Sequence, residues 1–192
     1  FDFLKVNNVR NISNVHITPS AGLNLVVGPN ASGKTALLEA IHLLARARSF
    51  RTPRIKEVIQ RGQETLQVSA QISKKKIGTV ATGIEKSYGT TVIRFAGEPL
   101  KTVSEQANNI PLIIITPDSH NLVTGSPNDR RHWLDWAMFH VEPSYITVWR
   151  KYQKALRNRN NLLKYGKKGQ EIVSWESGML TAANALNELR GN

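Results

Sequence analysis

One stretch of eight residues constrains the fold of this chain more than any other feature of its sequence. It reads Gly28-Pro29-Asn30-Ala31-Ser32-Gly33-Lys34-Thr35 and matches the phosphate-loop pattern G-x-x-x-x-G-K-[ST] in full. The pattern carries weight only where a strand precedes it and a helix follows it. Leu23–Val27 is an apolar run that ends in a glycine, and Lys34–Arg46 carries apolar side chains at helical spacing. The sequence therefore predicts a buried strand, a glycine loop and a helix in that order.

The phosphate loop predicts which ligand this region binds. Successive backbone N–H groups and a helix N-terminus supply positive potential, and the glycines let phosphates approach closely. Lys34 would reach the β and γ phosphates, and the Thr35 hydroxyl would bind Mg²⁺, which prefers oxygen ligands. All eight loop residues are therefore candidate nucleotide ligands, and the alternative is a glycine turn before an ordinary helix. Ala31 replaces a more common glycine, which costs little if its φ stays negative.

Hydrolysis needs more than this loop, namely a carboxylate from a second strand for Mg²⁺ and a group that orients water. After residue 35 the sequence contains no run of four apolar residues followed by Asp or Glu. The nearest candidate is Asp118, which follows the apolar run Pro111–Ile115 through Thr116-Pro117. Because a proline-containing turn is a poor match to that pattern, the residues predict nucleotide binding and leave hydrolysis open.

The first part of the chain is rich in strand patterns. Phe3–Val6 and Val15–Ile17 alternate as strands do, and Thr65–Phe95 is β-rich with turn signals between its segments. Pro111–Ile115 has the pattern of a short buried strand. We expect an antiparallel β lobe beside a nucleotide-binding core.

The second part of the chain is helical. Ser126-Pro127 has the character of a helix start and predicts a helix over Asn128–Phe139. Two further helices, over about Tyr145–Tyr165 and Val173–Arg190, are predicted to form an antiparallel pair joined by the polar loop Gly166–Gly169. The first of this pair could follow a DNA backbone or present a solvated face, since it carries six cationic residues: Arg150, Lys151, Lys154, Arg157, Arg159 and Lys164.

Composition narrows the class of protein. Lys and Arg number 26 against 14 Asp and Glu, a formal net charge of +12, so an anionic partner is physically plausible. The absence of cysteine excludes disulfide frameworks, thiolate metal sites and cysteine nucleophiles. No apolar stretch approaches the ~20 residues of a membrane span, so we expect a soluble, cytoplasmic protein with no membrane partner. The start at Phe1 suggests a fragment.

Several segments together resemble one protein family. Ala31–Ile41 is followed by Arg48-Ser49-Phe50-Arg51-Thr52, and Gly125–Asp135 is similar to the pattern G-S-P-x-x-R-R-x-x-L-D. The opening Leu4–Asn11 is similar as well. These segments resemble the RecF family, bacterial recombination mediators whose ATPase head is related to the ABC and SMC classes. The resemblance covers essentially the whole chain.

The resemblance implies an α/β fold: the N-terminal half of a P-loop NTPase head of the ABC/SMC type. Residues 1–124 would form this part of the head with its antiparallel β lobe, and residues 125–192 a truncated helical lobe. Arg10 and Asn11 would lie near the adenine or ribose, although a turn between the first two strands explains them equally well. The family's signature motif, second acidic motif and switch histidine are absent, so we expect slow ATP hydrolysis only in a full-length protein.

The resemblance also implies a function. Family members bind ATP and Mg²⁺ between two heads, so ATP would induce a homodimer that binds DNA at single-strand gaps. Together with RecO and RecR, such a protein would promote recombinase loading in DNA replication, recombinational repair and the SOS response to DNA damage. Two alternatives stay open from the residues: a P-loop kinase or GTPase, and a nucleic-acid-binding module with a vestigial phosphate loop. No Asn-Lys-x-Asp-like segment favours a GTPase.

Overall fold

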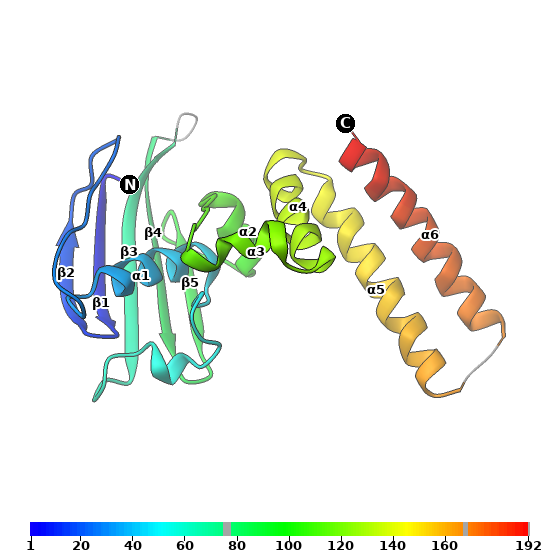
Figure 1. The fold of residues 1–192 in the computed structure, drawn as a ribbon, viewed down its shortest axis with the longest axis horizontal. Helices are drawn as coiled ribbons and strands as arrows, with labels where there is room; N and C mark the ends of the chain where they lie inside the picture. Colours follow the sequence, from blue (N-terminus) through cyan, green and yellow to red (C-terminus); the bar gives the residue numbers. More distant parts are fainter. Residues whose placement is uncertain (75–77, 167–168, 192) are drawn as a thin grey trace. The chain divides into compact units, whose positions relative to one another are not determined.

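The computed structural model describes residues 1–74, 78–166 and 169–191, which form two compact units (Figure 1). The first unit is Phe1–Ile114 and the second is Ile115–Asn192. The phosphate loop belongs to the first unit, and the cationic helix to the second.

An antiparallel sheet is the framework of the first unit. Its six strands follow the order β2 (Ile12–Ile17), β1 (Phe3–Val9), β3 (Thr65–Lys74), β4 (Gly78–Ser87), β5 (Thr91–Phe95) and β6 (Glu98–Pro99). Every neighbouring pair is antiparallel. Along β3 buried and exposed side chains alternate, as expected for a sheet that is covered on one face only. The predicted early strands and the antiparallel β lobe are confirmed, and they join in a single sheet.

Helix α1 (Lys34–Arg46) covers one face of this sheet (Figure 1), and its predicted bounds are confirmed. Its fully buried Leu43 and Leu44 belong to one apolar core with Val6 of β1 and Leu66 of β3. Burying a side chain of this size stabilises the fold by about 1.5–3 kcal/mol. The core therefore holds α1, whose first residues Lys34 and Thr35 end the phosphate loop, against the sheet.

Short helices complete the first unit. A 3₁₀ helix, η1 (Ile55–Glu57), precedes β3, and α2 (Val103–Asn109) follows β6. The buried Gln106 amide of α2 donates to the Leu44 carbonyl at 2.9 Å and to the Thr82 hydroxyl at 3.0 Å. These two bonds connect α2 to the end of α1 and to β4.

Two predicted strands do not form, and both predictions of a buried strand are wrong for this chain. Leu23–Val27 lies outside every strand, with Leu23 93% and Leu25 81% exposed. Pro111–Ile115 is also irregular, and Ile115 is 84% exposed. An apolar run becomes a buried strand only when a neighbouring strand pairs with its backbone and other side chains cover it. The described strands pair with one another and with neither segment, so the expected mixed sheet around the phosphate loop is not formed by the described residues.

The second unit is helical. It contains η2 (Pro117–His120), α3 (Asn121–Thr124), α4 (Pro127–Val141), α5 (Tyr145–Lys164) and α6 (Gln170–Gly191). The unit begins at Ile115, and within it η2 and α3 contact each other and α3 contacts α4. The helix start at Ser126 is confirmed: the Asp129 carboxylate accepts from the Ser126 amide at 2.9 Å and from its hydroxyl at 2.8 Å. Lys167 and Lys168 of the predicted loop lie outside the described residues.

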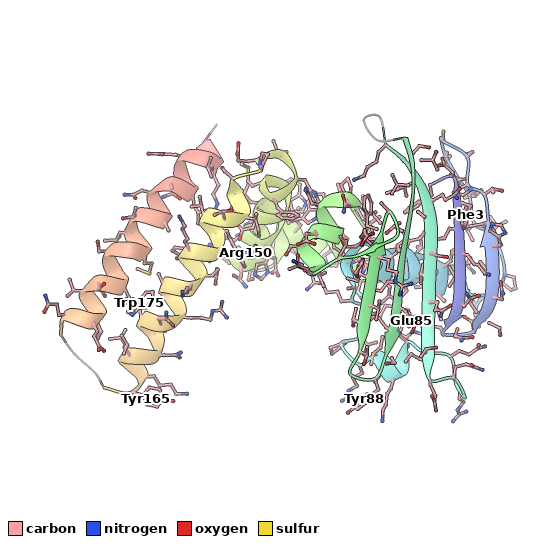
Figure 2. All side chains as sticks on the ribbon, turned by 180° about the vertical axis from the view of Figure 1, so that it is seen from behind. Phe3, Glu85, Tyr88, Arg150, Tyr165 and Trp175 are labelled. Atoms are coloured by element: carbon pink, nitrogen blue, oxygen red, sulfur yellow. The ribbon has the colours of Figure 1, made fainter. Side chains whose placement is uncertain are left out.

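Helices α5 and α6 form the predicted antiparallel pair (Figure 1). Arg190, near the end of α6, donates to the hydroxyl of Tyr145 at the start of α5, over 3.0 Å. Arg159 of α5 pairs with Glu176 of α6 at 2.8 Å. In Figure 2, Trp175 marks the same part of α6. None of the helices in the described part of the chain has the length and apolar character of a membrane span.

Asp135, the last residue of the Gly125–Asp135 motif, joins α4 to both of these helices. Its carboxylate accepts from the Tyr145 hydroxyl, from the Trp149 indole and from the Arg190 guanidinium. Burial and the bond to Asp135 raise the pKa of Tyr145 to about 12, so its hydroxyl stays protonated. Within the described residues this end of the motif therefore has a structural role.

Candidate nucleotide-binding site

The two glycines of the phosphate-loop pattern are required by local geometry. Gly33 precedes α1 with a φ of 100°, a left-handed conformation that favours glycine. A Cβ atom on Gly28 would lie 2.8 Å from the Ser32 Oγ, closer than real Cβ atoms approach other atoms. A side chain at Gly33 would therefore strain the backbone, and one at Gly28 would require the Ser32 side chain to move.

Ala31 has a φ of 65°, so the condition of a negative φ is not met. A non-glycine residue in this left-handed conformation costs about 1–2 kcal/mol. The Asn11 side chain donates to the Ala31 carbonyl at 2.7 Å, and the Ser32 amide donates to the Pro29 carbonyl at 3.3 Å. These bonds hold the loop in its strained form.

The loop lines one side of an open cavity of about 410 Å³, a size typical of ligand pockets. Its lining contains most of the predicted nucleotide ligands together with two further residues: Arg10, Asn11, Asn30, Ala31, Ser32, Gly33, Lys34, Thr35, Ala36 and Arg51. Gly28 and Pro29 do not line the cavity, but their carbonyl groups hold Lys34 by accepting from its ammonium at 2.8 and 2.7 Å. An ammonium has three donors, so Lys34 keeps one N–H for an entering anion.

The chemistry of the cavity suits a phosphate chain with a bound cation. Lys34 and Thr35 form the start of α1, where the first amides have no acceptor within the helix. These amides and the helix dipole attract anions. The described residues contain no group of three or more His, Cys, Asp or Glu that could hold a metal. A single hydroxyl ligand from Thr35 fits Mg²⁺, which keeps waters and takes phosphate oxygens as ligands.

Arg10 and Asn11 lie in the turn between β1 and β2 and also line the cavity. Both have structural partners. Arg10 donates to both oxygens of the Glu39 carboxylate, at 2.9 and 2.8 Å, and to the Glu57 carbonyl. The two residues thus lie in a turn that borders the phosphate-loop cavity, and their place near the adenine or ribose stays a prediction.

Comparison with known proteins agrees with this geometry. The AAA domain family matches residues 4–172, which include the phosphate loop. The chain belongs to this family. Within it, the DNA replication and repair protein RecF of Pseudomonas entomophila is 40% identical over 191 residues. RecF of Pseudomonas fluorescens is 40% identical over 189 residues. These alignments cover 98% and 97% of this chain, which spans about half (52%) of the length of the curated relatives it matches.

Two solved structures resemble this chain in fold. The structure of the recombination mediator protein RecF-ATP in the RecFOR pathway covers 100% of this chain and 52% of its own, with a TM-score of 0.88 and 27% identity. A structure of ATP-driven dimerisation in SMC ATPases covers 71% of this chain and 98% of its own, with a TM-score of 0.59 and 20% identity, so it shows the fold alone. The resemblance to RecF and the P-loop NTPase fold are confirmed.

The sequence did not point to two residues at this cavity: Arg51, which lines it, and Glu39, which forms ion pairs with Arg10 and Arg51. Glu39 lies on the buried face of α1, three residues after Ala36 and four before Leu43, and is itself fully buried. A charged residue in register with an apolar helix face was the available signal. Burial alone would raise the pKa of Glu39, but bonds from Arg10 and Ser49 and nearby positive charge hold it below its usual value. Glu39 is therefore ionised at neutral pH.

The loop after α1 forms a second cavity, of about 630 Å³, which shares Arg51 with the first. His42 lines it, with its Nδ1 2.6 Å from the Arg48 carbonyl and its ring edge-on to Phe50. Burial, the largest effect, lowers the pKa of His42. Asp118, the candidate for Mg²⁺ or water, lies in η2 of the second unit.

Proposed function

We propose that this chain forms the ATP-binding part of a DNA-binding ATPase that acts in cytoplasmic DNA replication and repair. The observation that carries the proposal is the open cavity in which Lys34, Thr35 and the first amides of α1 meet. The names of the curated relatives and the solved RecF-ATP structure support ATP as its ligand. The phosphate loop would hold the triphosphate by backbone N–H groups and by the Lys34 ammonium.

Mg²⁺ would bind at the Thr35 hydroxyl and would neutralise charge on the β and γ phosphates. No Asp or Glu is among the residues that line the described cavity. Glu39, behind it, is already paired with Arg10. Slow hydrolysis would therefore depend on groups other than the residues that line this cavity. The relatives are about twice as long as this chain, and a second copy closing over ATP as a homodimer would cover the open side.

DNA is the anionic partner that this proposal names. The exposed cationic residues of α5 are Arg150, Lys151, Lys154, Arg157 and Lys164, spread over most of the helix. In Figure 2 Arg150 lies on α5 and Tyr165 at its end. Helical rise separates Lys151 from Lys164 by about 20 Å, so the face could contact several phosphates. Binding at single-strand gaps and recombinase loading with RecO and RecR complete the proposal, supported by the RecFOR pathway in which the solved relative acts.

Calorimetry on the full chain with Mg²⁺ tests the nucleotide site. Lys34→Met removes charged hydrogen bonds to phosphate, so ATP affinity should fall at least about a hundredfold. Lys101→Met, at an exposed position in a loop, is the matched control and should bind as the parent does. Unchanged ATP affinity in Lys34→Met would remove the basis of the proposal. Tighter binding of GTP than of ATP would instead support a GTPase.

The salt dependence of DNA binding tests the α5 face. The pair Lys154→Gln and Arg157→Gln should lower the slope of log affinity against log salt by about 0.9 for each lost phosphate contact. Arg159→Gln is the control, because Arg159 is engaged with Glu176. An equal slope in all variants would exclude this face. DNA binding that ignores ATP would favour the module with a vestigial phosphate loop.

A further inference from the structure

An exposed aromatic side chain lies at the end of helix α5. Two of the four tyrosines in the chain are largely exposed, Tyr88 at 74% and Tyr165 at 77%. Tyr165 directly follows Lys164, the last residue of α5 (Figure 2). A tyrosine ring offers a large, flat apolar surface, and the ring of Tyr165 is open to a ligand that stacks on it.

The helix holds the backbone of Tyr165 in place, although its side chain is exposed. The Tyr165 amide donates to the Asn161 carbonyl at 3.1 Å, and the Gly166 amide donates to the Leu163 carbonyl at 3.0 Å. Gly166 has a φ of 67°, the left-handed conformation in which helices commonly end. Because the backbone is already ordered and a tyrosine side chain has two rotatable χ angles, covering this ring costs little conformational freedom.

A row of polar and cationic side chains on α5 leads to Tyr165. Lys154, Arg157 and Lys164 are exposed. With Asn161 they follow one another at intervals of three, four and three residues, which places them on one face of the helix. Tyr165 follows Asn161 by four residues and continues this row. Helix α5 contains no Asp or Glu, so its own residues do not repel a polyanion that lies along this face.

The row has the length of a short segment of duplex DNA. Lys154 and Lys164 are ten residues apart, which corresponds to about 15 Å along a helix. Phosphates of one strand are about 3.4 Å apart along the duplex axis, so the row extends over about four base pairs. A duplex held by these cations would therefore have one end of the contact at Tyr165.

The ring can stack on a base only where a base face is open. Inside a continuous duplex, neighbouring base pairs cover both faces of each base, and a side chain reaches a face only after unstacking it. At a single-strand gap, the unpaired bases and the last base pair of the duplex leave faces uncovered. Aromatic side chains stack on such faces with little regard to base identity, since every base has a π-face.

We propose that Tyr165 is a base-stacking residue that gives the α5 face a preference for DNA with open base faces, as at a gap, over continuous duplex. Lys154, Arg157 and Lys164 would bind phosphates of the duplex, and the Tyr165 ring would stack on the first open base beside it. This inference rests on the proposed function, because it takes DNA as the partner of α5. It adds the residue that distinguishes the two forms of DNA.

Fluorescence anisotropy with a gapped and a continuous duplex of the same sequence tests this role, on the full chain with ATP and Mg²⁺. Tyr165→Ala should bind gapped DNA about tenfold more weakly, as expected for the loss of one stacked base, and continuous duplex as tightly as the parent does. Tyr165→Phe keeps the ring and should keep the affinity for gapped DNA. The slope of log affinity against log salt should stay the same in both variants, because stacking neutralises no phosphate.

Tyr88→Ala is the matched control, because Tyr88 is a tyrosine of nearly equal exposure in the first unit, where the Lys56 ammonium lies 4.5 Å from its ring centre. It should leave the affinity for both DNAs unchanged. A thermal melt should show that Tyr165→Ala folds as the parent does, since the side chain is exposed. Tyr165→Leu, apolar without an aromatic ring, is the second variant and should show the same selective loss.

A fluorescent purine analogue at the edge of the gap reports stacking directly. Its emission should be quenched by the parent and by Tyr165→Phe, and should stay unquenched with Tyr165→Ala. This signal depends on a ring against the base, which a purely structural role of Tyr165 would not provide.

Three results would overturn the inference: unchanged affinity of Tyr165→Ala for gapped DNA, an equal loss on both DNAs, or the same selective loss in Tyr88→Ala. The first is expected if the end of the hairpin contacts another protein instead. The pair Lys154→Gln and Arg157→Gln separates this failure from failure of the proposed function, because it should weaken binding to both DNAs. If that pair does so while Tyr165→Ala changes neither affinity, the DNA face stands and only the stacking role is lost. A parent chain that binds neither DNA would overturn both.

Discussion

Two segments of the first unit have a strong strand pattern, and only one of them forms a strand. β3 pairs with β1 on one side and with β4 on the other, and α1 covers its apolar face. Leu23–Val27 leads into the phosphate loop and has neither a paired strand nor a cover among the described residues. Apolar character thus shows that a segment is able to be a buried strand. The neighbour that pairs with it decides whether it becomes one.

Amide hydrogen exchange should show the largest difference between these two segments. The amides of Val68 and Ile72 in β3 should exchange at least about a thousandfold more slowly than those of Leu25 and Val26, because they open only with the sheet. The measurement is residue-resolved exchange on the 192-residue chain. In a protein of the relatives' full length, we expect added strands to slow exchange over Leu23–Val27. Slow exchange there in the short chain would show that this segment is already paired.

A matched pair of leucine substitutions gives the next largest effect. Leu66→Ala in β3 removes a side chain that is 0% exposed, so the free energy of unfolding should fall by about 2–5 kcal/mol. Leu25→Ala changes a side chain that is 81% exposed and should alter it by less than about 0.5 kcal/mol. Denaturant unfolding measures both values. Similar losses in the two variants would contradict the contrast between the segments.

Ala31→Gly should have the smallest effect, in the loop that connects Leu23–Val27 to α1. Glycine relieves the left-handed conformation at φ 65°, but it also gives the unfolded chain more freedom. The balance should raise the free energy of unfolding by about 0.5–1 kcal/mol. Ala36→Gly, in α1, is the control and should be destabilising. A loss of stability in Ala31→Gly would show that Ala31 is not strained.

Local features of the fold could be predicted from the sequence. The bounds of α1, the early strands, the antiparallel lobe and the helix start at Ser126 all follow from residues that are close in the chain. Helix periodicity, strand alternation and capping act over a few residues, so a short window contains their cause. The phosphate loop is another local feature, because its glycines are favoured by the backbone conformation and close contacts of the loop itself.

The tertiary structure decided what depends on distant partners. Leu23–Val27 stays exposed for lack of a neighbouring strand. The ion pair between Arg10 and Glu39 joins residues 29 positions apart, and that between Asp135 and Arg190 joins residues 55 apart. An ion pair or a strand pairing depends on which groups the fold brings within a few ångströms. Spacing along the chain does not contain that information.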